Sequence, residues 1–151
     1  MLKGIDPLLG PELLAALARM GHGDEIAVVD RNYPAYSAGP PVIRADGVDT
    51  VRAVQGICSV LPLDTFVERP FAYMHDGRDE PHPVTLDVLA VVRRAEGRDV
   101  GTEGLAREAF YRRARSAAVV LTTGESRPYG CFVLTKGVWP QLEPAPSSDA
   151  A

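Results

Sequence analysis

The apolar residues of the chain repeat at two spacings, and each spacing predicts a different kind of element. Helical spacing of apolar residues occurs in three segments: 11–20, 49–61 and 84–95. Pro11 suits a first helical turn because its missing N–H is not needed there, and Gly21 is expected to end that helix in the left-handed conformation. In the third segment we expect Leu86 to face inward. A fourth helix is expected from Thr102, a capping residue, to about Ser116.

Short runs of β-favouring residues lie between these helices and predict strands. They are Ile26–Val29, Val42–Ile43, Phe71–Met74, Ala117–Leu121 and Cys131–Leu134. The continuous apolar runs indicate strands that are buried on both faces. Strands that alternate with helices predict a three-layer α/β/α fold with a largely parallel, mixed central sheet. We expect one domain over residues 1–140 and a flexible tail over 141–151, which has little apolar surface to bury.

Composition narrows the class of protein. The chain has 151 residues, 46% of them hydrophobic, and a formal net charge of −4. An acidic chain gains no electrostatic attraction to phosphate backbones, so we expect no nucleic-acid partner. The sequence shows neither a secretory leader nor an apolar run of the roughly 20 residues that span a membrane. We therefore expect a cytoplasmic protein without a membrane association.

Polar residues near the ends of the predicted strands are candidates for a site. Open α/β sheets bind ligands off the carboxyl ends of their strands. Asp30 follows the first strand, Tyr129 lies in the loop before the last strand, and Arg107 lies on the helix before Ala117–Leu121. His22 stands between two glycines just before the first strand. These side chains form a polar set suited to a small hydroxylated ligand.

Each candidate also has a purely structural interpretation. His22 could bond the free carbonyls at the end of the first helix. Asp30 could be an ordinary turn residue, Arg107 could belong to a solvated face with its neighbouring arginines, and Tyr129 could pack a loop. The residues alone do not decide between these interpretations.

Several kinds of site are not indicated. His75 and His82 lie in a loop rich in proline and acids, and we interpret both as surface residues. The three histidines lack zinc-helix spacing and there is no HExxH, so no metal site is expected. Cys58 and Cys131 make neither a disulfide framework nor a CxxC pair. The chain also lacks a Walker loop and a GxGxxG motif, so we expect no nucleotide cofactor.

Four blocks of sequence resemble one known family. They are "ELLAALARMGHGDEIAVVDRNYPAYS" (12–37), "GPPVIRADG" (39–47), "REAFYRRA" (107–114) and "TGESRPYGCFVLTKGV" (123–138). In this order and spacing the blocks resemble the L-fucose mutarotase / D-ribose pyranase family. The resemblance implies an isomerase, of the racemase and epimerase type, that interconverts anomers or ring forms of a reducing monosaccharide without a metal or other cofactor.

The resemblance also implies roles for individual residues. His22 matches the family's proton-transfer histidine, and Asp30 matches a carboxylate that binds the sugar. Arg107 falls where fucose mutarotases carry arginine and ribose pyranases more often carry histidine.

One substrate-contacting tripeptide departs from the family pattern. Tyr129, Gly130 and Cys131 match its positions, but the pattern has asparagine where this chain has Cys131. A thiol offers only weak donor and acceptor properties in place of an amide. The departure puts the identity of the sugar in doubt more than the type of reaction.

The spacing of His22 and Asp30 raises a geometric question. They are eight residues apart, and a strand advances about 3.3 Å per residue, which is too far for one monosaccharide to bridge. Either the segment around Gly21 and Gly23 doubles back, or the site joins two subunits. The family's ring-like assemblies, which reach decamers with sites at subunit boundaries, favour the second solution.

The leading hypothesis is therefore a mutarotase acting on L-fucose or a similar sugar, in a homo-oligomer. A D-ribose pyranase is the nearest alternative, and Arg107 argues against it. A non-catalytic sugar-binding or transport accessory protein is an alternative of another class, in which His22 would only hydrogen-bond the ligand.

Overall fold

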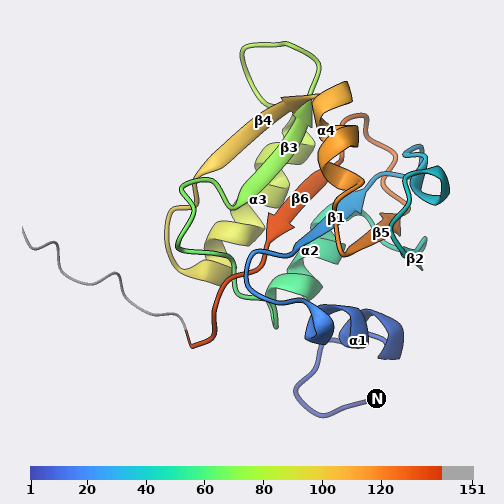
Figure 1. Ribbon diagram of the computed structural model, residues 1–151, viewed down its shortest axis with the longest axis vertical. Coiled ribbons are helices and arrows are strands. Elements are labelled where there is room, and N and C mark those ends of the chain that lie inside the picture. The colour runs from blue at the N-terminus through green and yellow to red at the C-terminus, as the bar shows by residue number, and fades with distance from the viewer. Residues whose placement is uncertain (141–151) are drawn as a thin grey trace, which may run out of the picture.

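A six-stranded sheet forms the centre of the protein. The computed structural model describes residues 1–140, and the strand order is β2-β5-β1-β6-β3-β4 (Figure 1). The strands are β1 (Glu25–Val29), β2 (Val42–Ala45), β3 (Phe71–His75), β4 (Thr102–Ala106), β5 (Val119–Thr123) and β6 (Phe132–Thr135). β1 and β2 both run parallel to β5, β3 runs parallel to β4, and β6 is antiparallel to both its neighbours. The predicted largely parallel, mixed sheet is confirmed.

Helices cover both faces of this sheet. They are α1 (Pro11–Arg19), α2 (Thr50–Cys58), α3 (Pro83–Glu96) and α4 (Arg107–Ala114), with a short 3-10 helix at Ala35–Ser37. Side chains of β1 alternate between the two faces. Ile26 and Val28 join a core with residues of α1, α2 and α3, whereas Ala27 and Val29 join a core with α4. α4 thus lies across the sheet from α2 and α3, which confirms the three-layer prediction (Figure 1).

The antiparallel β6 fixes which loops meet at each end of the sheet. Glu25 of β1 is opposite Thr135, and Val28 is opposite Phe132. Residues just before Glu25 therefore lie near residues that follow Thr135. Residues just after Val29 lie near those that precede Phe132. His22, which precedes β1, and Asp30, which follows it, therefore lie at opposite ends of the sheet.

One predicted helix begins five residues too early. The segment Thr102–Ala106 is strand β4, parallel to β3 at the edge of the sheet, and α4 begins only at Arg107. This edge strand is not buried, so its sequence "TEGLA" lacks the β-branched apolar run that marks the inner strands. Pairing with β3 overrides a local pattern that is equally compatible with a helix.

Three smaller predictions about single residues are also wrong. α1 ends at Arg19 with Met20 in extended conformation, and the glycine with positive φ is Gly23, at +87°, rather than Gly21. Leu86 points outward and is 53% exposed. His82 is buried rather than on the surface, because its ring stacks on that of Tyr129. The predicted tail, 141–151, lies outside the described residues.

No helix in residues 1–140 has both the length and the apolar character needed to cross a membrane.

Candidate functional site

His22 lies in the loop between α1 and β1, at the amino end of β1. Its neighbour Gly23 turns the chain and donates its N–H to the carbonyl of Lys136 at 2.9 Å, and the N–H of Lys136 donates to the carbonyl of Asp24 at 2.8 Å. These two bonds extend the pairing of β1 with β6 past the end of the strand. The loop that carries His22 is therefore held against the sheet.

A buried carboxylate holds the His22 ring. His22 Nε2 lies 3.0 Å from Asp64 Oδ1, and the Asp64 side chain is only 1% exposed whereas that of His22 is 47% exposed. The same Oδ1 accepts the backbone N–H of Phe66 at 3.0 Å, and the Phe66 ring lies 5.1 Å from the imidazole. If Nε2 donates to the carboxylate, the second ring nitrogen, Nδ1, is left as an acceptor. His22 thus presents a half-exposed imidazole whose ring direction is fixed by Asp64.

The structure argues against the helix-capping interpretation of His22. The ammonium of Lys136 bonds the carbonyl of Met20 and lies 3.5 Å from that of Leu17 at the end of α1. A cation there also complements the negative end of the helix dipole. His22 is instead directed at Asp64.

A hollow of about 420 Å³ opens beside this pair, with Asp64, Gly23 and Glu25 among its lining residues. The guanidinium of Arg113 bonds Glu25 at 2.7 Å and Glu103 at 2.8 Å across the hollow. The hollow lies at the amino end of β1, next to His22, and its size suits a small ligand.

The second group of predicted residues gathers at the opposite end of β1. Asp30 is 7% exposed, and its Oδ1 accepts the N–H of Asn32 at 3.0 Å, which closes a tight turn. Cys131, directly before β6, is fully buried, and its thiol lies against the Asp30 carboxylate. Burial raises the pKa of Cys131 well above its ordinary value, and the negative charge of Asp30 raises it further. The thiol is therefore neutral at physiological pH.

Gly130 fits where a larger residue would not. A Cβ atom at this position would lie 2.7 Å from Glu125 Cγ and 3.7 Å from Asp30 Cβ. Tyr129, just before it, is a non-glycine residue with a φ of +61°. The backbone of Tyr129 and Gly130, in the predicted tripeptide next to Asp30, is thus tightly constrained.

Tyr111 and Arg107 of α4 complete this end. Tyr111 packs against the core cluster that contains Cys131, and burial raises its pKa. The Arg107 guanidinium lowers this pKa and the Asp30 carboxylate raises it. Arg107 itself is exposed, with Nε 3.8 Å from a Glu108 carboxylate oxygen. Arg107 begins α4, and its role in a site stays a prediction. Asp30, Gly130 and Cys131 are brought together, with Tyr129 packed against the core cluster that contains Cys131. His22 is not among them, because β1 separates it from Asp30.

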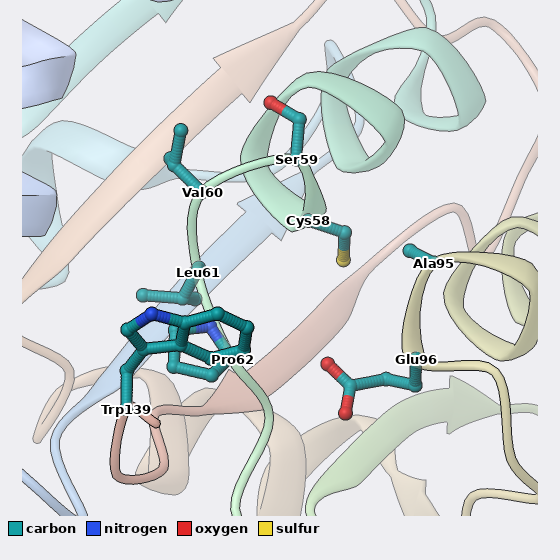
Figure 2. Close-up of a pocket in the computed structure, with 8 residues that line it drawn as sticks. All are labelled: Cys58, Ser59, Val60, Leu61, Pro62, Ala95, Glu96 and Trp139. Carbon is teal, nitrogen blue, oxygen red and sulfur yellow. The ribbon is translucent and has the colours of Figure 1, made fainter. Parts of the chain in front are cut away.

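A further cavity contains none of the predicted residues. It measures about 520 Å³ and lies at the carboxyl ends of α2 and α3, where Cys58, Glu96 and Trp139 line it (Figure 2). The Cys58 thiol is unreactive because burial and the charge of Glu96 raise its pKa to about 12. Glu96 accepts the N–H of Leu63 at 2.9 Å. These groups have structural partners and carry no catalytic arrangement.

Among residues 1–140, no three or more His, Cys, Asp or Glu side chains are grouped so as to hold a metal ion. The expected absence of a cofactor stays a prediction.

The model of the RbsD / FucU transport protein family matches residues 3–139 of this chain. The chain belongs to the RbsD/FucU family. An L-fucose mutarotase of Actinobacillus pleuropneumoniae is 42% identical over 93% of this chain and 99% of its own length. The human fucose mutarotase is 45% identical over 91% of this chain and 94% of its own. The crystal structure of the Streptococcus pneumoniae fucose mutarotase in complex with L-fucose is 35% identical over 91% of this chain and 99% of that one, with a TM-score of 0.83.

Reasoning from sequence missed three residues that this RbsD/FucU structure places beside the candidates. Asp64 holds His22, Tyr111 lies beside Asp30, and His82 stacks on Tyr129. Tyr111 is part of the block "REAFYRRA", so a search for polar side chains within the matched blocks could have found it. Nothing in the local sequence indicates the other two contacts, which join segments far apart in the chain.

Glu125 lies next to Gly130, at the end of the sheet that holds Asp30. We expect Glu125 to contribute to the stability of the fold. Its carboxylate accepts from Arg127 Nε at 2.9 Å and Thr50 Oγ1 at 2.9 Å. Burial alone would raise the pKa of Glu125, but the hydrogen bonds from Arg127 and Thr50 outweigh it and lower the pKa from 4.5 to about 2. A lowered folded-state pKa gives stability that is present above pH 4.5 and is lost as the pH falls toward 2.

Replacing Glu125 with glutamine should therefore lower the free energy of unfolding by about 2 kcal/mol at pH 7, and by much less near pH 3. Urea unfolding of both proteins at the two pH values measures this. Asp87→Asn is the matched control, because it removes the exposed partner of the same arginine and should cost no more than about 1 kcal/mol. An equal loss in Glu125→Gln at both pH values would contradict the assignment.

Proposed function

We propose that this protein is a sugar mutarotase that interconverts the anomers of L-fucose or a similar reducing monosaccharide. The observation that carries the proposal is the exposed His22 ring fixed by the buried Asp64 carboxylate, at 3.0 Å. The relatives named L-fucose mutarotases, which match over nearly their whole length, support the same reaction. The protein is accordingly an isomerase acting on carbohydrates.

The proposed chemistry needs only proton transfers. Ring opening removes the proton of the anomeric hydroxyl and adds a proton to the ring oxygen, and closure after rotation about C1–C2 yields the other anomer. Asp64 holds Nε2 of His22, so Nδ1 is the atom that exchanges protons with the sugar. Histidine suits this task because its ordinary pKa of about 6.5 makes both forms available near neutral pH. No metal or other cofactor enters the reaction.

Asp30, Arg107, Tyr129, Gly130 and Cys131 are the proposed sugar-binding residues. The Asp30 carboxylate accepts from sugar hydroxyls, and Arg107 and Tyr129 donate to them. Cys131 takes the place of an asparagine of the family pattern, and its buried neutral thiol makes weaker hydrogen bonds than an amide. Tyr111 is a further hydroxyl at this end of the sheet.

We infer that a complete site is shared between two subunits. His22 lies before β1 and Asp30 after it, so the five residues of β1 separate them, and the two side chains lie on the order of 20 Å apart. The turn at Gly23 leaves His22 at the amino end of β1, which supports the two-subunit solution over the doubled-back one. We propose a homo-oligomer, up to a decamer, in which His22 of one subunit meets Asp30 and Tyr129 of its neighbour. A cytoplasmic location fits an enzyme of this kind.

Magnetisation-exchange NMR tests the proposed reaction. Reducing sugars are measured with and without the protein, and faster exchange between the two anomeric signals of L-fucose is the expected result. An accessory protein that only binds sugar would broaden or shift the signals without accelerating their exchange. Acceleration of ribose pyranose–furanose exchange alone would assign the protein to the pyranase branch.

The same measurement tests substrate preference. We expect a sugar with a methyl or hydroxymethyl group at C5 to be accelerated at least about tenfold more than ribose, because one apolar group in a fitted site contributes discrimination of that order. The expectation rests on Arg107, which matches the fucose branch. L-fucose and D-arabinose, which share ring stereochemistry and differ by the methyl group, make the sharpest pair. Equal or faster exchange with ribose would contradict the preference.

A further inference from the structure

The ring of Tyr129 is stacked on the ring of His82. The two ring centroids are 4.7 Å apart and the ring planes differ by only 11°. His82 precedes α3 as its N-cap residue, whereas Tyr129 lies in the loop between β5 and β6. The stack therefore joins two loops that are distant in the sequence, at the end of the sheet that holds Asp30.

His82 is itself held in place. Its side chain is 10% exposed, and its Nε2 lies 3.2 Å from Asp76 Oδ2. This contact lacks hydrogen-bond alignment, and no described residue offers Nε2 another hydrogen-bond partner. The imidazole thus contacts a carboxylate through Nε2 and the Tyr129 phenol ring through one of its faces. A buried ring nitrogen without an aligned hydrogen bond costs free energy, so packing alone does not favour histidine at this position.

The backbone of Tyr129 is held in an unusual conformation. Its φ of +61° lies in the left-handed region that residues with a side chain rarely adopt. Gly130 on its far side is packed against Glu125 and leaves no room for a larger residue. The backbone at Tyr129 is thus fixed, and the stacked His82 ring restricts the side chain that it carries.

We propose that His82 is a positioning residue for Tyr129. The imidazole covers one face of the phenol ring and fixes the direction in which the hydroxyl meets the sugar, while His82 itself does not touch the sugar. Asp76, which lies 3.2 Å from Nε2, limits the movement of the imidazole. The inference rests on the proposed function, in which Tyr129 binds the substrate.

Loss of the stack should weaken substrate binding. A tyrosine ring that is free to move must be ordered when the sugar binds, and that ordering costs affinity. We expect His82→Ala to raise KM about two- to tenfold, as expected for loss of one aromatic pair, with kcat changed much less. His82→Phe keeps a flat ring at this position and should restore KM to within about twofold of the parent value.

The matched control is His75→Ala. His75 lies on β3 in the same region and its Nδ1 accepts the N–H of Gly77 at 2.9 Å. It makes no ring contact with Tyr129 among the described residues. We expect its KM for L-fucose to equal that of the parent protein.

A second measurement, the NMR chemical shift of the Tyr129 ring, detects the stack independently of enzyme activity. In protein with labelled tyrosine, the Tyr129 ring signals are assigned by their loss in Tyr129→Phe. Shielding by the imidazole should displace these signals upfield in the parent, and the displacement should vanish in His82→Ala and reappear in His82→Phe. This signature does not depend on the substrate.

The outcomes separate the two proposals. A parent protein that accelerates no sugar exchange contradicts the proposed function, and the Tyr129 signals then still show whether the stack exists. An active parent whose His82→Ala variant keeps both KM and kcat contradicts the positioning role. So does a raised KM that His82→Phe fails to lower, because the effect would then not depend on a stacked ring.

Discussion

Replacing His22 with alanine should abolish accelerated anomer exchange while the protein stays folded. We expect a loss of about 10²–10⁴-fold, the usual contribution of a positioned general acid–base. The fold should survive because the His22 side chain is 47% exposed and lies outside both apolar cores. Exchange rates from magnetisation-transfer NMR, with thermal unfolding of the same samples, measure both effects.

Two further variants make this test specific. His22→Gln can still hydrogen-bond Asp64 but cannot exchange a proton near neutral pH, so we expect it to be as inactive as the alanine variant. His75→Ala removes another histidine and should keep parental exchange. Parental activity in His22→Ala would refute the catalytic assignment. Parental activity in His22→Gln would show that a hydrogen bond is sufficient and that proton transfer by His22 is not required.

Mixing two inactive variants should restore activity. If His22 of one subunit and Tyr129 of its neighbour form one site, then oligomers reassembled from equal amounts of His22→Ala and Tyr129→Ala protein contain some boundaries with both residues intact. In a ring with identical interfaces, random assortment of subunits leaves both residues intact at about a quarter of the boundaries. Exchange activity near a quarter of the parental value is therefore expected.

The mixture needs two controls. Each variant alone, dissociated and reassembled in the same way, should stay inactive, and mass spectrometry should show that subunits have mixed. A mixture of His22→Ala with Asp64→Ala is the matched comparison, because Asp64 contacts His22 within one subunit at 3.0 Å. Both lesions then fall on the same side of every boundary, and no recovery is expected. Failure of the first mixture in verified mixed oligomers would mean that His22 and Tyr129 act within one subunit.

The strands and helices with strong periodic patterns were predictable from sequence. β1 and β5 are continuous apolar runs that alternate between two buried faces, and the mixed sheet follows from their alternation with helices. Thr102–Ala106 shows the limit of this reasoning. An edge strand buries too little to show a strand pattern, and only its hydrogen bonds to β3 decide that it is not helical.

The residues of the candidate site were likewise only partly predictable from the sequence. Asp30, Arg107, Tyr129, Gly130 and Cys131 could be selected from the sequence because they follow strands or lie in blocks that resemble a known family. Their gathering at one end of the sheet agrees with the rule that carboxyl ends of parallel strands meet at one edge. The predicted roles of these residues and of His22 stay predictions that the experiments above test.

By itself the sequence determined the α/β class, the order of most elements, the family and the polar residues available for sugar chemistry, because those depend on local periodicity and on blocks of adjacent residues. Only the tertiary structure decided which side chains meet. Asp64 lies 42 positions from His22, and His82 lies 47 positions before Tyr129, yet each pair is in contact. The structure also decided that His22 and Asp30, only eight positions apart, lie at opposite ends of one strand. Contact between side chains depends on the pairing of strands and the packing of loops across the whole chain, and no local pattern encodes it.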